Sequence, residues 1–148
     1  MGTSLLSALA TSFFATLGFG VLLHAPTRAL WQAALAGMAA NGCYYALGAL
    51  HLPDPAAIFA AALGASLLAE LLARRMKMAA TVFITLSIIP LVPGLALYRA
   101  MAALARGESE AGLSQGVSAM TSFLMIALGI GLGSFLVRLG KKAGPRPS

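Results

Sequence analysis

The chain has 148 residues, of which 59% are hydrophobic and only 9% are charged, and its formal net charge is +6. An ordinary soluble domain carries about 25% charged residues, so the composition excludes a soluble globular domain and predicts a single transmembrane domain over residues 1–148. No basic stripe interleaved with aromatic residues is present, which excludes nucleic acid as the partner of the positive charge, and the single cysteine, Cys43, excludes an intrachain disulfide or a Cys-based zinc site.

Five apolar segments follow one another along the chain, and each is close to the ~20 residues that a helix needs to cross a bilayer. They lack the alternation of barrel strands, so we expect an all-α integral membrane protein with five transmembrane helices. The first segment lacks a basic region before it and is longer than the apolar part of a signal peptide, so we interpret it as a helix. The segments cover residues 3–23, 29–50, 55–73, 79–105 and 115–137, followed by a tail over residues 138–148.

Lysine and arginine gather on one side of these segments. Arg28 lies in the first connection, and the other basic residues of that side lie in the third connection and the tail. The opposite side holds Arg106 together with the carboxylates of Asp54, Glu108 and Glu110, while Arg99 lies within the fourth segment. By the positive-inside rule, the N-terminus is outside and the C-terminus is cytoplasmic. The basic residues assigned to the cytoplasmic side are Arg28, Arg74, Arg75, Lys77, Arg138, Lys141, Lys142 and Arg146.

Two polar residues lie inside the second and third segments. Asn41, in the run NGCYY, needs a hydrogen-bond partner there and either bonds a neighbouring helix or contacts a substrate. Glu70 lies four residues before Arg74, which predicts an i,i+4 ion pair near the cytoplasmic end. If that pair is loose, burial favours the protonated carboxyl and makes Glu70 a proton-coupling candidate.

Small residues recur along the segments and predict close helix packing, which is what holds helices together in lipid. They include Gly37, Gly42, Ala56, Ala60, Gly64, Gly129, Gly131 and Gly133.

The fourth segment contains the run IIPLVPGLALYR over residues 88–99, in which Pro90, Pro93 and Gly94 interrupt an apolar helix. Each proline lacks an N–H and clashes with the carbonyl four residues earlier, so the carbonyls of Leu86 and Ile89 lose their helical partners. Non-helical backbone at mid-membrane persists only where it is buried in protein or lines a wet cavity. Broken helices of this kind indicate the substrate site of a transporter.

A half-helix that begins near Pro93 directs free N–H groups and a positive dipole end at the break. A zwitterion could place its carboxylate there and its ammonium on the freed carbonyls. The alternative is a kink that only bends the helix. Arg99 either faces the site or snorkels to the outer surface, and Tyr98 is either a gate or an interfacial anchor. The candidate substrate-binding residues are Asn41, Leu86, Ile89, Pro90, Pro93, Gly94, Leu95, Tyr98 and Arg99.

No Ser–His–Asp set, metal-ligand spacing or phosphate-binding loop is present, so the sequence predicts neither an enzyme nor a cofactor or metal site. A small homo-oligomeric multidrug exporter of the four-helix type relies on a carboxylate in its first span, and the first segment here has none.

The run IIPLVPGLALYRAM, residues 88–101, resembles the Pro-x-x-Pro-Gly signature of the threonine/serine exporter family, and FGVLLHAPTRAL, residues 19–30, is similar to that family's first loop. The resemblance spans most of the chain and is to the split form, in which a small hydrophobic subunit works with a larger one. It implies a proton-driven secondary transporter of the bacterial inner membrane that exports threonine or serine; related pairs have been linked to a dicarboxylate.

The resemblance also implies a larger partner with a cytoplasmic domain and five spans of its own. Five spans that begin outside would pair with five that begin inside as an inverted repeat around a midplane site. Two alternatives stay open: a subunit that assembles or stabilises its partner without transporting, and a homo-oligomer.

Overall fold

The computed structural model describes residues 2–142, which are helical apart from short connections. The predicted all-α fold is confirmed. The last helix continues past residue 138 into the predicted tail, and residues 143–148 of that tail lie outside the described part. The elements are α1 (Gly2–Leu22), α2 (Thr27–Ala49), α3 (Asp54–Met76), α4 (Ala80–Ile88), the 3₁₀-helix η1 (Ile89–Leu91), α5 (Gly94–Ala105) and α6 (Ser109–Lys142).

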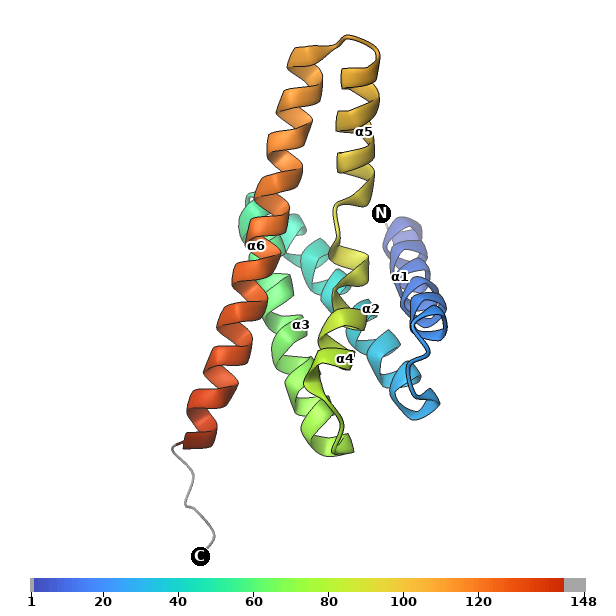
Figure 1. Cartoon of the computed structure of the whole chain (residues 1–148), viewed down its shortest axis with the longest axis vertical. Helices are drawn as coiled ribbons and strands as arrows, with labels where there is room; N and C mark the ends of the chain where they lie inside the picture. The colour runs from blue at the N-terminus through green and yellow to red at the C-terminus, as the bar shows by residue number, and fades with distance from the viewer. Residues whose placement is uncertain (1, 143–148) are drawn as a thin grey trace, which may run out of the picture.

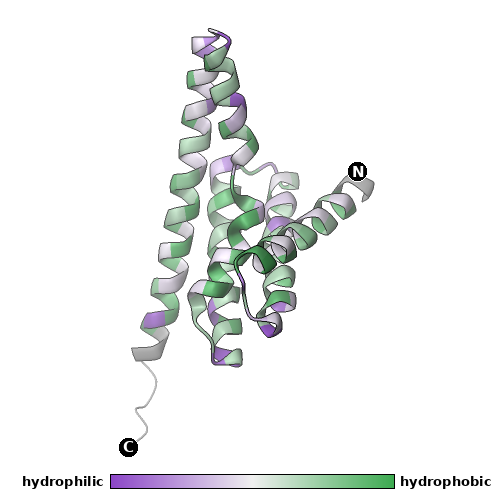
Figure 2. Ribbon diagram, turned by 45° about the vertical axis from the view of Figure 1, so that its right-hand side comes forward, coloured by the Kyte–Doolittle hydropathy of each residue, from purple (hydrophilic) through white to green (hydrophobic). Residues whose placement is uncertain are grey.

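Four of the helices end in the same tight turn, which keeps the connections short. At the end of α1, the N–H of Ala25 donates to the Gly20 carbonyl at 2.9 Å and that of His24 to the Val21 carbonyl at 3.0 Å. This is the Schellman pattern, which satisfies carbonyls that the helix end leaves free. The same pair of bonds closes α2, α3 and α5. Each turn contains one residue with positive φ; in chain order these are His24, His51, Lys77 and Gly107. Figure 2 shows hydrophilic residues gathered at these turns and hydrophobic residues along the helices.

α2 is the central element of the bundle. It packs against α1, α3, α4 and η1, whereas α5 packs mainly against α6, which also lies along α3. The α5–α6 hairpin projects beyond the other helices (Figure 1). The buried face of α2 is made of small residues together with one amide, Asn41. Close packing of small residues is the expected way to hold helices together in lipid.

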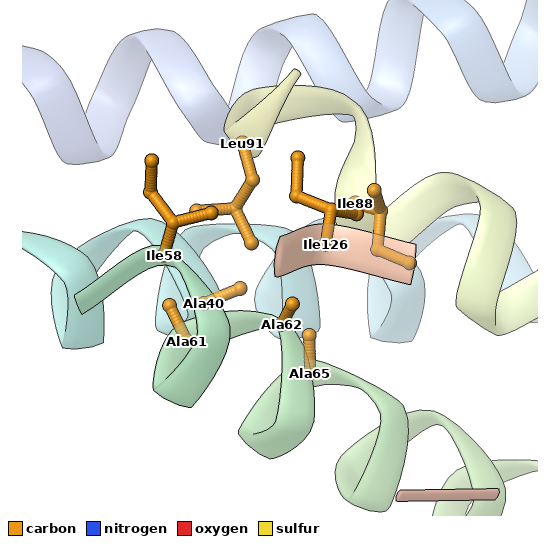
Figure 3. Packing of buried hydrophobic residues seen from close by; sticks show 8 residues of the cluster. All are labelled: Ala40, Ile58, Ala61, Ala62, Ala65, Ile88, Leu91 and Ile126. Atoms are coloured by element: carbon orange, nitrogen blue, oxygen red, sulfur yellow. The ribbon is translucent and has the colours of Figure 1, made fainter. Parts of the chain in front are cut away.

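The predicted interruption of the fourth segment is confirmed. α4 ends at Ile88, η1 makes a short 3₁₀ turn, and α5 begins at Gly94 with a bend of 52° from the axis before the break. One side of the break is buried among apolar side chains, because Ile88 and Leu91 pack against α2, α3 and α6 (Figure 3). That buried cluster consists of Ala40, Ile58, Ala61, Ala62, Ala65, Ile88, Leu91 and Ile126.

Within the described residues, α1, α3 and α6 are each long and apolar enough to cross a membrane, and the bent pair of α4–η1 and α5 would make a fourth span. α2 has 23 residues but is not among them, because residues such as Gln32 and Asn41 lower its hydropathy. The five-span arrangement and its orientation therefore stay predictions. With 34 residues, α6 is also longer than the predicted segment 115–137, and at 1.5 Å per residue it extends about 51 Å.

Candidate functional site

A cavity of about 990 Å³ lies beside the helix break. Side chains from α1, α2, α3, η1, α5 and α6 line it, so the broken segment forms one wall and the projecting α5–α6 hairpin another. Its lining residues are Ala8, Thr11, Ser12, Ala15, Asn41, Tyr44, Tyr45, Asp54, Pro55, Ile58, Pro90, Leu91, Pro93, Leu95, Ala96, Val117, Ser118, Thr121 and Ser122.

The break contributes backbone polarity to this cavity. The N-cap of α5 is Pro93, and no side chain caps the helix. Gly94 donates its N–H to the Val92 carbonyl at 2.8 Å, and the next two residues, Leu95 and Ala96, line the cavity. The first N–H groups of a helix have no intrahelical acceptor, so the positive end of α5 lies at the cavity wall.

The predicted site residues fall into two groups. Asn41, Pro90, Pro93 and Leu95 line the cavity together, although they come from different elements. The other five are absent from its lining: Leu86, Ile89, Gly94, Tyr98 and Arg99.

The second group lies elsewhere for identifiable reasons. The expectation that the Ile89 carbonyl is free is wrong, because it accepts the N–H of Val92 at 3.3 Å in the 3₁₀ turn. Leu86 is only 1% exposed and its side chain packs among Ala29, Ala33 and Phe83. Tyr98 is 69% exposed and Arg99 is also exposed, on faces of α5 that do not border the cavity.

Asn41 is buried at the junction of α1 and α2. Its Nδ2 donates to the Ser12 Oγ at 2.6 Å, which answers the need for a partner on a neighbouring helix. The same side chain lines the cavity and is 9% exposed. The two roles that the sequence left open for Asn41 are therefore compatible in position.

Sequence reasoning missed the hydroxyl lining and Asp54. The hydroxyls come from two helix faces, Thr11 and Ser12 on α1 and Ser118, Thr121 and Ser122 on α6. The spacing i, i+3, i+4 on α6 is the signal that could have found them, because it puts three polar side chains on one helix face. Asp54 was assigned to a connection, and only the packing of α3 against α2 reveals that it borders the cavity.

The predicted Glu70–Arg74 ion pair is not formed. Arg74 instead donates from Nη2 to the Val137 carbonyl of α6 at 2.9 Å, because α3 and α6 lie side by side and bring that acceptor within reach. Glu70 is half-buried on α3. Among the residues that the structure describes, the only ion pair joins Arg106 and Glu108 at 3.0 Å in the α5–α6 turn. The hydrogen bond from Arg106, and then its charge, hold the pKa of Glu108 below its usual range.

A second cavity of about 280 Å³ lies between the α1–α2 turn and α4. His24, Thr81, Thr85 and Leu86 are among its lining residues. Within residues 2–142, no group of three or more His, Cys, Asp or Glu side chains is arranged to hold a metal ion.

Comparison with known proteins matches most of the chain to one family. The family model described as "Threonine/Serine exporter, ThrE" matches residues 8–136. A protein of Mycobacterium tuberculosis (strain ATCC 25618 / H37Rv), named "Probable threonine/serine exporter", is 35% identical over 114 residues. The match covers 76% of this chain and 22% of that relative, so the chain spans less than a quarter of the relative's length. No solved structure matches the chain significantly.

Proposed function

The chain belongs to the threonine/serine exporter family, and from this premise we propose that it is a membrane subunit of a secondary transporter that exports a small zwitterionic or carboxylate metabolite. Threonine and serine are the first candidates. The subunit works in the cell membrane with a larger five-span partner, which supplies the remaining length of the path. Proton coupling is assigned to Glu70, the one acidic side chain half-buried inside a candidate span.

One observation carries this proposal: the cavity of about 990 Å³ at the broken helix. A bilayer offers no solvent for exposed backbone, so an unwound segment persists where it lines a cavity that polar molecules can enter. The uncapped start of α5, with Leu95 and Ala96 on the cavity wall, is suited to a substrate carboxylate. The volume is ample for a metabolite of amino-acid size.

The packing around the break supports an alternating-access cycle. In the orientation predicted from the charges, Asp54 and the part of the cavity that it lines lie toward the outside, and we infer that the buried cluster around Ile88 and Leu91 separates the cavity from the cytoplasm. Export then requires this cluster to separate so that the same wall faces the cytoplasm. α5, which packs mainly against α6 whereas α6 is also held along α3, is the element freest to move.

A single substitution on the cavity wall tests the proposal. Ala96→Phe fills the space at the start of α5, whereas Leu97→Phe changes the adjacent residue, which is 41% exposed and absent from the cavity lining. In cells that carry this chain and its partner, and that are fed a threonine-containing dipeptide, we expect Ala96→Phe to lower threonine export at least about tenfold, because a blocked site loses transition-state binding. Leu97→Phe should export like the wild type.

Equal export by both variants would remove the cavity from the mechanism. Reconstitution separates transport from the alternative role as an assembly subunit. Vesicles that hold the partner alone should move no threonine if this chain contributes part of the site. Full transport by the partner alone would make this chain a stabilising subunit only.

A further inference from the structure

The hydroxyl groups that α1 and α6 contribute to the cavity lining offer acceptors and not donors. The hydroxyls of Ser12, Thr121 and Ser122 donate to the carbonyls four residues earlier in their own helices, at 2.7, 2.9 and 3.0 Å. Thr11 and Ser118 bond in the same way. A hydroxyl has one hydrogen to donate and two lone pairs, so once the hydrogen is committed to the helix the oxygen offers only acceptor positions to the cavity.

The charged side chain at the cavity also favours a ligand that donates hydrogen bonds and carries positive charge. Asp54 is the only charged residue among the described residues that line it, although the whole chain carries 10 lysines and arginines. Asp54 is exposed at the start of α3, where Pro53 is the N-cap and no side-chain cap is formed, so its carboxylate is not committed to the helix end. The carboxylate lies within hydrogen-bonding reach of the Tyr44 hydroxyl, which also lines the cavity, and it keeps further lone pairs for a second donor.

We propose that Asp54, with the acceptor hydroxyls of α1 and α6, recognises the ammonium group of the substrate, so that the cavity accepts amino acids and rejects dicarboxylates that lack an amino group. The inference rests on the proposed transport function and narrows its substrate class. It also replaces the carbonyls of Leu86 and Ile89 as the ammonium partners, since the Ile89 carbonyl accepts a hydrogen bond from Val92 and neither residue lines this cavity.

A dicarboxylate fits this lining poorly. It brings only acceptors when ionised, and the uncapped turn of α5 could satisfy one carboxylate but not two. The second carboxylate would meet hydroxyl oxygens and Asp54, and like charges at close range are unfavourable. Discrimination by an unfavourable contact of this kind is a common source of specificity.

Direct binding to the complex of this chain with its partner, purified in detergent micelles, tests the inference without requiring transport. The probes are radiolabelled L-threonine and radiolabelled succinate. We expect the wild type to bind threonine at least about tenfold more tightly than succinate, and Asp54→Asn to weaken threonine binding about tenfold, the size of a lost charge-assisted hydrogen bond. Glu110→Gln is the matched control: it removes the same charge from an exposed residue outside the cavity and should bind threonine like the wild type.

A second variant keeps the test decisive if Asp54→Asn fails to fold. Thr121→Val preserves side-chain shape and removes one acceptor oxygen, and it should weaken threonine binding several-fold. Unchanged threonine binding in both variants would overturn the role of the acceptor lining and leave the proposed transport function standing. Tighter binding of succinate than of threonine by the wild type would reverse the substrate class, again without touching transport. Binding of neither probe by the wild type would count against the site itself and the inference with it.

Discussion

At the scale of single residues, the contact between Asn41 and Ser12 joins two functions of the molecule. The bond of 2.6 Å crosses from α2 to α1, and both residues also line the cavity. An amide buried among helices costs free energy unless it is hydrogen-bonded. The bond therefore both fixes α1 against the centre of the bundle and holds the cavity wall in place.

Removing the acceptor should loosen this pair of helices. We predict that Ser12→Ala lowers the free energy of unfolding by about 1 kcal/mol, the usual size of a hydrogen bond between helices in a membrane. Titration with sodium dodecyl sulfate in mixed micelles measures the change. Ser118→Ala is the control, because that hydroxyl bonds only within α6 and its loss leaves no amide unpaired. Equal stability of the two variants would show that the Asn41 bond contributes nothing between helices.

Some site residues could be predicted from sequence and others could not. Proline and glycine alter the backbone wherever they occur, so Pro90 and Pro93 identified one wall of the cavity without any knowledge of packing. The sequence also indicates Asn41 as a candidate, because a polar group inside a span needs a hydrogen-bond partner. Asp54 and the α6 hydroxyls depend on which helices meet, and the Glu70–Arg74 pair failed because α6 offers Arg74 a carbonyl that the sequence of α3 cannot reveal.

At the scale of elements, the contact of α3 with α6 depends on two glycines. A methyl group on Gly129 would lie 2.8 Å from the Phe59 carbonyl oxygen, and one on Gly133 would lie 2.8 Å from the Ser66 Cβ. Backbone atoms cannot move aside as a flexible side chain can. The two helices are therefore as close as they are because these positions have no side chain.

This close approach predicts a sharp difference between neighbouring glycines. Gly129→Val should lower the free energy of unfolding by about 1–3 kcal/mol through overpacking and shift α6 away from α3. Gly131→Val is the matched control, because nothing lies within 4 Å of a methyl group at that position. Detergent titration measures stability, and cross-linking of cysteines placed on α3 and α6 measures the separation. Equal effects of the two substitutions would mean that helix propensity, and not contact, decides the outcome.

The helix break and the turns could be predicted from sequence because each depends on the residues at that point of the chain. The break after residue 88 follows from proline geometry, and the turns follow from polar residues between apolar runs. α6 begins earlier than the predicted span 115–137, because its first turns carry serine, glutamate and glutamine, a composition typical of a connection. Those turns are helical because α5 folds back on them and places Leu104 beside Gly112. This is a tertiary contact, which the local sequence of α6 cannot reveal.

At the scale of the whole molecule, the charges and the cavity together define two ends. Arg74, Arg75 and Lys77 lie at the turn between α3 and α4, whereas Asp54 lies at the start of α3, beside the cavity. The α3–α4 turn and the tip of the α5–α6 hairpin lie at opposite ends of the long axis of the molecule (Figure 1). The positive-inside rule assigns the basic end to the cytoplasm.

Labelling of two exposed positions tests that assignment. In a Cys43→Ser background, which removes the only cysteine, Glu110→Cys reports the hairpin end and Arg75→Cys the basic end, and both positions are exposed. A maleimide that cannot cross membranes should label Glu110→Cys in intact spheroplasts and Arg75→Cys only after permeabilisation, because the arginine-rich turn is retained in the cytoplasm. The reverse pattern would mean that the cavity faces the cytoplasm. The closed cluster at Ile88 and Leu91 would then block release of the substrate to the outside, and not its entry from the cytoplasm. Because both positions are exposed in the folded chain, reagent can reach either cysteine, and a difference between them reports the membrane.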